Sequence, residues 1–194
     1  MLGSQVTTVI TPFPALITDV SGTTTPYNLQ VGETISRSYS SATTVELYTI
    51  VGGGIYELFI QNNGDTGTAY DSLNLYPNSN TGYTNAFDWG MHYIDTVHGV
   101  ATGAVTSTDY TTGQNNTFTG WPSAGFGHIT ISTAIKCKIL QGTATQVHYV
   151  NNSTSIRHAW WTSRWYDTTT AWTSLGQILF NGPMTGTITI KRIS

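Results

Sequence analysis

The sequence predicts an all-β protein, specifically a jelly-roll-like antiparallel β-sandwich with long irregular loops. The 194-residue chain is rich in threonine, glycine, serine and asparagine, whereas the helix-favouring residues glutamate and lysine are scarce. Apolar and polar residues alternate with period two over residues 129–139, which is typical of a strand with one buried face. Clusters of glycine, proline and asparagine separate such runs at the spacing expected of a sandwich.

The order of these patterns predicts an arm followed by one domain. Residues 1–30, with three prolines among threonine and serine, are expected to form an extended N-terminal arm or an edge strand. Residues 31–194 are expected to form a single β-sandwich domain, since all-β sandwiches often reach this length without dividing. A loop-rich insertion is predicted at about 61–127, where the alternation fades and turn-forming residues mix with aromatic ones. The predicted strands are residues 5–10, 28–36, 45–51, 55–60, 129–139, 143–150, 175–180 and 185–193.

Two hairpins are predicted within this domain. Three consecutive glycines at 52–54 would join the strands on either side of them, because glycine supplies the positive φ of a tight connection. The sequence NGPMTG would join the last two strands. In the strand at 129–139, the alternation places Lys136 and Lys138 on the outward side.

Composition excludes several classes of protein. Charged residues make up 9% of the chain and the net charge is −3, so no broad positive surface is expected for nucleic acid. No secretory signal and no apolar run long enough to cross a bilayer are present, so a soluble chain without membrane insertion is expected. A surface that is polar yet uncharged is typical of a chain buried in an assembly, or of one that binds neutral polar ligands such as glycans.

No catalytic residue, metal ligand or cofactor is predicted. His92, Asp95 and His98 are the best candidates for metal ligands, but their spacing fits neither one face of a strand nor the one-turn offset of a zinc-binding helix. Glycoside hydrolysis requires two facing carboxyl groups. Ten acidic residues contain a possible pair by chance, so the sequence favours a protein that is not an enzyme.

Four of the six tryptophans lie between residues 157 and 178. Strand alternation places Trp161 and Trp165 on one side and Trp160 and Arg164 on the other. At least two of the four tryptophans are expected to pack in a core, and Trp172, at the entrance to the next strand, is expected to be one of them. The second side is amphipathic and better suited to contact with a neighbouring chain or a ligand. The candidate binding or interface residues are Trp160, Arg164, Tyr166, Trp89 and Trp121.

Several motifs show a resemblance to a known group of proteins. The runs STAIKCKILQGTATQVHYVNN, SRWYDTTTAWTSLGQILF and GTITIKRIS resemble the C-terminal β-sandwich modules of tailed-bacteriophage virion proteins, including tail-fibre, head-fibre and appendage components. The runs GGGIYEL and LNLYPNSNTGYTNAF are similar to other portions of such chains. The middle of the chain, residues 61–127, departs from the pattern.

The resemblance implies a structural component on the exterior of a bacteriophage virion, a tail or head appendage or fibre protein. Its alternatives are a host-glycan-binding (receptor-binding) module and a capsid decoration protein, with a polysaccharide depolymerase as the enzymatic alternative. The partners implied are other copies of the chain in a homotrimer, other virion proteins and host-surface polysaccharide. The resemblance supplies no shared catalytic residue.

Overall fold

A computed structural model shows a chain built of β-strands. The structure describes residues 27–47, 49–63, 73–79, 87–97, 100–107, 118–120, 124–134, 136–150, 153–165 and 168–194. Within these ranges the only helical element is one 3₁₀ turn, η1 (Pro77–Ser79), and there is no α-helix. The prediction of an all-β protein is therefore confirmed.

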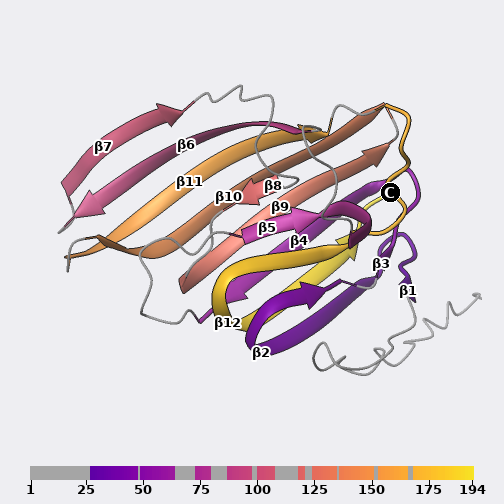
Figure 1. Ribbon diagram of the computed structural model, residues 1–194, viewed down its shortest axis with the longest axis horizontal. Coiled ribbons are helices and arrows are strands. Elements are labelled where there is room, and N and C mark those ends of the chain that lie inside the picture. Colours follow the sequence, from indigo (N-terminus) through magenta and orange to yellow (C-terminus); the bar gives the residue numbers. More distant parts are fainter. Residues whose placement is uncertain are drawn as a thin grey trace, which may run out of the picture.

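Ten strands form a single antiparallel sheet, which is curled into a half-barrel (Figure 1). Along the sheet the order is β7-β6-β11-β10-β9-β4-β12-β5-β8, and β2 pairs with β12. The short strands β1 and β3 form a separate parallel pair. The strands are β1 (Tyr27–Asn28), β2 (Thr34–Glu46), β3 (Thr49–Ile50), β4 (Ile55–Asn62), β5 (Leu73–Tyr76), β6 (Phe87–Val97), β7 (Val100–Ser107), β8 (Phe118–Gly120), β9 (Ala124–Ala134), β10 (Cys137–Val150), β11 (Ser153–Trp165) and β12 (Gln177–Arg192).

The curl of the sheet is made by β2 and β12, which bend together as a pair. The first part of β12, residues 177–179, lies between β2 and β5, whereas residues 186–191 lie between β2 and β4. The register with β2 slips between Leu179 and Gly186, and Ser41 in β2 has a φ of 50°. Irregularities of this kind let a strand turn from one part of a sheet to another. The hairpin predicted through NGPMTG is wrong, because β12 continues through this sequence as one bent strand.

The strand predicted at 129–139 is a hairpin instead. Strand β9 ends at Ala134, which pairs directly with Cys137 at the start of β10. A two-residue turn reverses the chain and also changes which parity faces inward: Ile129 and Ile131 are buried on β9, whereas Lys138 is buried on β10. The prediction that Lys138 points outward is therefore wrong, while Lys136, in the turn, is exposed.

The three glycines at 52–54 do not close a hairpin either. The run 45–51 is divided between the end of β2 and β3, and neither pairs with β4. Strand β4 lies between β9 and β12, so its partners come from later in the chain. The glycine segment is held by the Gly54 carbonyl, which accepts a hydrogen bond of 2.9 Å from the backbone N–H of Thr133.

The remaining expectations about chain organisation fall partly outside the described residues. The predicted strand 5–10 and most of the predicted arm 1–30 lie there, and within the arm the structure describes β1 and the few residues that follow it. The range 61–127, predicted to be rich in loops, contributes β5, β6, β7 and β8 to the sheet.

The core lies inside the curl. Alternate residues of β4, β9 and β12 are buried there, and Tyr39 of β2 stacks on Phe180 of β12 with ring centroids 5.3 Å apart. The Tyr39 hydroxyl donates a hydrogen bond to Asn62 Oδ1, and burial raises the pKa of this tyrosine. The buried side chains from the three strands are Tyr56, Leu58, Ile60, Ile129, Ile131, Ile188 and Ile190.

Asn78 of η1 joins two segments that are far apart in sequence. Its side-chain Oδ1 accepts hydrogen bonds from the backbone N–H groups of Thr173 (2.8 Å) and Ser174 (2.9 Å), and its Nδ2 donates to the carbonyl of Ala171 (3.0 Å). The Asn78 backbone N–H donates to the Ser174 carbonyl at 3.1 Å. Residues 77–79 are thereby docked on the segment that leads into β12.

Candidate functional site

The outward face of the sheet carries an unusual mixture of residues. In β4, Tyr56, Leu58 and Ile60 are buried, whereas Phe59 and Gln61 are exposed. On β9, Phe126 is exposed on the same outward face. Large aromatic side chains on the solvent side of a strand are not explained by core packing, so this face is the candidate site.

The pairing register aligns these residues across the sheet. Thr189 of β12 pairs with Phe59, Phe59 with His128 of β9, His128 with Thr143 of β10, and Thr143 with Trp160 of β11. Directly paired residues project from the same face of a sheet. We call this line of residues the outer row; from β2 to β11 it consists of Ser36, Thr189, Phe59, His128, Thr143 and Trp160.

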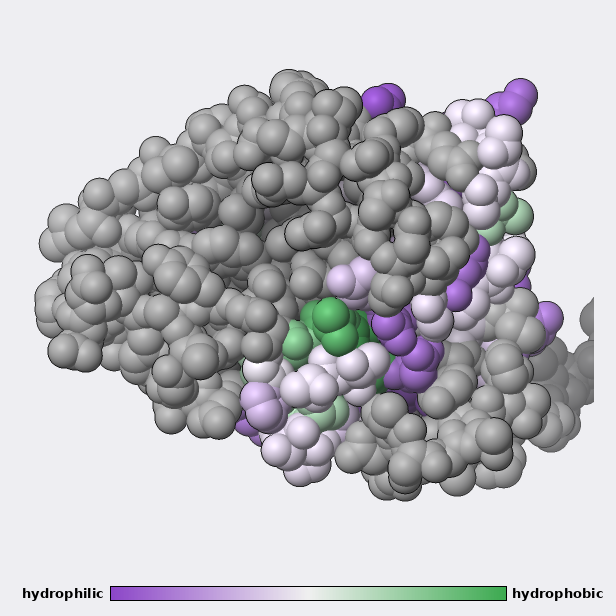
Figure 2. Space-filling model, in the orientation of Figure 1, coloured by the Kyte–Doolittle hydropathy of each residue, from purple (hydrophilic) through white to green (hydrophobic). Residues whose placement is uncertain are grey.

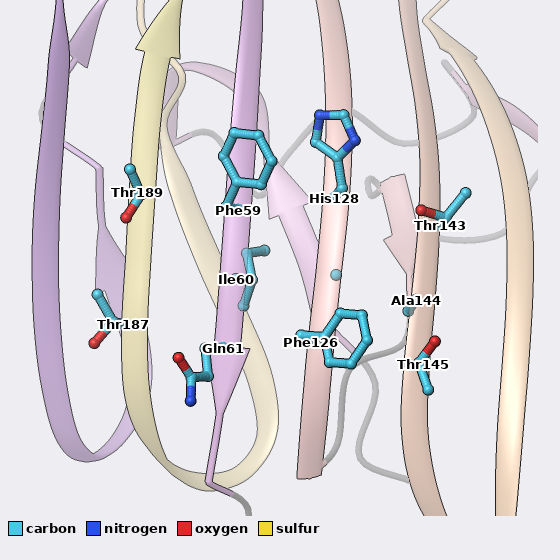
Figure 3. Close-up of a pocket in the computed structure, with 11 residues that line it drawn as sticks. Phe59, Ile60, Gln61, Phe126, His128, Thr143, Ala144, Thr145, Thr187 and Thr189 are labelled. Carbon is cyan, nitrogen blue, oxygen red and sulfur yellow. The ribbon is translucent and has the colours of Figure 1, made fainter.

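A groove of about 440 Å³ lies along part of the outer row (Figure 3). In Figure 1, β5 and β8 lie in front of the sheet. The groove is on the other face of the sheet, which Figure 3 shows. Its volume is within the range of small-ligand sites, about 300–1,000 Å³. The groove is lined by Phe59, Ile60, Gln61, Phe126, Gly127, His128, Thr143, Ala144, Thr145, Thr187 and Thr189.

Two rings form the centre of the groove. Phe59 and His128 stack with centroids 4.5 Å apart and planes inclined by 4°, and Figure 3 shows them side by side above their strands. His128 Nε2 lies 3.5 Å from Glu57 Oε1. Phe126, two residues before His128 on β9, is 62% exposed. The groove therefore offers two aromatic surfaces, the Phe59–His128 stack and the Phe126 ring.

Threonine hydroxyls line both sides of these rings. On one side, Thr189 Oγ1 lies 2.8 Å from Ser36 Oγ and Thr187 Oγ1 lies 3.5 Å from Ser38 Oγ. On the other side, Thr145 Oγ1 is hydrogen-bonded to His158 Nδ1 at 3.0 Å. A hydroxyl has one donor and two acceptor positions, so each keeps capacity for a ligand.

The lining of the groove is almost without charge. None of its residues is a lysine, arginine, aspartate or glutamate, and His128 is its only titratable side chain. Glu57, which lies beside His128, places a carboxylate next to the groove. This arrangement can bind a neutral ligand through ring stacking and hydrogen bonds.

The structure describes three of the five residues that the sequence predicted for binding. Trp160 is 45% exposed in the outer row, and Arg164 is exposed on the same strand. Trp89 lies in β6 opposite Ser163, so it is not in register with either of them. Tyr166 and Trp121 lie outside the described residues. The outward side predicted for Trp160 and Arg164 is confirmed, whereas their role in binding stays a prediction.

The prediction that at least two of the four tryptophans, including Trp172, pack in the core is confirmed. Trp165 and Trp172 are 1% and 2% exposed, and their rings meet edge to face with centroids 6.0 Å apart. The buried Lys138 places its Nζ 3.7 Å from the Trp165 ring centroid and donates a hydrogen bond of 2.6 Å to the Thr170 carbonyl. These contacts explain how a lysine is accommodated in the core. The side chain of Trp161 is not among those described.

Phe59, Phe126 and His128 were missed by the sequence analysis, although the sequence carries a signal for them. In IYELFIQN the buried parity is Tyr56, Leu58 and Ile60, so Phe59 is an aromatic residue among the polar positions. A large aromatic residue on the polar parity of an amphipathic strand indicates an exposed contact surface. The missing information was that β4 and β9 are neighbours, which only the long-range pairing reveals.

The described residues hold no group of three or more histidine, cysteine, aspartate or glutamate side chains placed to bind a metal ion. They include no helix that is long and apolar enough to span a membrane. Of the three metal candidates from the sequence, His92 and Asp95 lie in β6, where the structure describes the backbone, and His98 lies outside the described residues.

Comparisons of the chain with protein-family models, with curated proteins and with solved structures found no match.

Proposed function

We propose that this chain is a structural component on the exterior of a bacteriophage virion, a tail or head appendage or fibre protein, with a jelly-roll-like β-sandwich fold. The antiparallel sheet supports the fold part of the proposal, because β2 and β12 pass together around a bend as strands do at the corners of packed sheets.

The observation that carries the proposal is that the motifs shared with phage virion modules contact one another in the structure. The motif LNLYPNSNTG contains Asn78, which is hydrogen-bonded to the backbone of Thr173 and Ser174 in the motif AWTSLG. The terminal GTITIKRIS pairs with the GGGIYEL strand from Thr187 opposite Gln61 to Arg192 opposite Tyr56. Motif residues that lie 95 or more positions apart in the sequence therefore belong to one structural unit, which is expected if they were inherited as one module.

The surface also fits a particle component. Figure 2 shows the face seen in Figure 1, on which the described residues are mostly hydrophilic or intermediate in hydropathy, with a small hydrophobic area. Only 9% of the residues are charged. Charge normally keeps a free cytosolic protein dispersed, so a chain with so little of it is better suited to an assembly.

We further propose that the chain assembles as a homotrimer. Scarce charge and frequent aromatic residues are typical of surfaces that become buried between copies. Light scattering coupled to size-exclusion chromatography should give a mass of three copies of the 21.0 kDa chain, independent of loading concentration over the micromolar range. A monomer that stays soluble at high concentration would contradict the trimer.

The protein composition of purified particles tests the function. In particles from cells that carry the gene, the chain should co-purify through a density gradient and resist a high-salt wash, because its surface offers few charges for salt-sensitive adsorption. Recovery of the chain in the soluble fraction alone would count against a virion component.

One observation favours a second candidate, a host-glycan-binding module. This is the groove along the outer row, since a purely structural chain has no need for exposed rings beside aligned hydroxyls.

A further inference from the structure

We propose that the groove between β12 and β10 is a binding site for a neutral oligosaccharide, with the Phe59–His128 stack and Phe126 as its stacking surfaces. This inference does not depend on the virion proposal, because it rests on the outward face of the sheet alone. It adds a ligand class and named contact residues to a chain that could otherwise be purely structural.

The rings supply the first part of the recognition. A pyranose ring has a face formed by C–H groups, which packs against the face of an aromatic side chain. Phe59 is 45% exposed and Phe126 is 62% exposed, and neither is needed to fill the core. Stacking of Phe59 on His128, 4.5 Å away, keeps the Phe59 ring in one orientation and lowers the entropy lost on binding.

The hydroxyl and amide groups supply the second part. Thr187 and Thr189 lie on β12, Gln61 on β4, and Thr143 and Thr145 on β10, so hydrogen-bonding groups stand on both sides of the rings (Figure 3). The contacts of Thr189 with Ser36 and of Thr145 with His158 fix the hydroxyl positions while leaving further donor or acceptor capacity. Sugar hydroxyls, which both donate and accept, match such groups.

The charge of the groove selects among ligands that could stack there. Nucleic acid and acidic glycans need cationic side chains, since single-strand binding sites combine stacking rings with a positive groove. The lining contains no lysine or arginine, and the Glu57 carboxylate stands 3.5 Å from His128 at its edge. The lining therefore offers no cation to pair with a negative ligand, which favours a neutral one.

The length of the outer row indicates an oligosaccharide instead of a single sugar. Phe59 and Trp160 are separated by three strand spacings, roughly 14 Å. His128 and Thr143 occupy the two positions between them. Trp160 is 45% exposed, so it extends the aromatic surface beyond the groove. A sugar chain that lies across the strands would meet Phe59, then the Thr143 hydroxyl, then Trp160.

Glycan binding by matched variants tests the proposal. The full chain is applied to an array of neutral, sialylated and sulfated oligosaccharides and to single-stranded DNA. We expect the chain to be retained on neutral glycans. Phe59→Ala and Phe126→Ser should each raise Kd by about tenfold or more, whereas Phe59→Tyr should keep most of the affinity. The control is Val31→Ala, which removes an apolar side chain that is also 62% exposed but lies outside the groove. Its affinity should equal that of the parent chain.

Because Phe59 and Phe126 are exposed, their replacement should change the melting temperature by less than about 2 °C, so a loss of binding would not reflect unfolding. The proposal is overturned if no neutral glycan is retained, if only sialylated or sulfated glycans or DNA are retained, or if the Phe59 and Phe126 variants bind as the parent does. A change of oligomeric mass in these two variants would also overturn it, since the face would then be covered by a second copy. None of these results bears on whether the chain is part of a particle.

Discussion

Replacing Gly176 with alanine should lower the free energy of unfolding by about 4 kcal/mol or more, which is at the exceptional end for a single substitution. Gly176 has a φ of +83°, and a Cβ there would overlap the carbonyl oxygen of Tyr76 and lie 2.7 Å from the backbone nitrogen of Ser79. These neighbours are backbone atoms of β5 and η1, so no side chain can rotate away. The expected consequence is loss of the contact between the 77–79 segment and the start of β12. Chemical denaturation followed by tryptophan fluorescence measures the change.

Gly32→Ala is the matched control for this variant. Gly32 has nearly the same φ, +85°, but no atom lies within 4 Å of the position of its Cβ. Its replacement should therefore cost only the backbone strain of a left-handed residue, about 1–2 kcal/mol. Equal losses in the two variants would contradict the account, because they would show that the close approach of β5 and η1 to Gly176 contributes nothing.

Trp172→Ala should cost about 3–5 kcal/mol, the usual range for removal of a large core aromatic side chain. Trp172 is 2% exposed and meets the Trp165 ring, which in turn lies against the buried Lys138. For a chain of this size the melting temperature should fall by roughly 6 to 20 °C. Differential scanning calorimetry gives this value directly.

Trp160→Ala, compared with Trp172→Ala, distinguishes a tryptophan on the contact surface from one in the core. Trp160 is 45% exposed on the outward face, so its loss should cost less than about 1 kcal/mol while weakening assembly or ligand binding. If Trp160→Ala lowers the melting temperature as much as Trp172→Ala, and leaves oligomeric state and binding unchanged, the division between core and contact tryptophans is wrong.

The local patterns of the sequence were sufficient to predict an all-β chain and to divide the residues of the tryptophan-rich strand between its two sides. Alternation is a property of neighbouring residues, so it placed Trp160 and Arg164 on one side of the strand and Trp165 on the other without knowledge of any pairing. The burial of Trp172 was expected from its position at a strand entrance and from the resemblance, since the modules that the chain resembles keep this position aromatic.

The errors came from turns and from long-range pairing. The run at 129–139 alternates through the Ala134–Cys137 turn, so periodicity alone does not reveal that the chain reverses and that Lys138 becomes an inward residue. The triglycine at 52–54 looked like a hairpin because nothing nearby shows that β12, more than a hundred residues later, pairs with both β2 and β4. The groove was missed for the same reason, since Phe59 and His128 become neighbours only when β4 and β9 pair.

The proposal of a virion component depends most on where the chain lies in an intact particle, and labelling with an antibody raised against the purified chain measures this directly. Intact and detergent-disrupted particles are incubated with the antibody and a gold conjugate and examined by electron microscopy, with particles from a deletion of the gene as the control. The account predicts gold on the outside of intact particles, confined to the tail or to appendages of the head, and none on the deletion particles. Labelling that is absent from intact particles, or that requires their disruption, would contradict a component of the particle exterior.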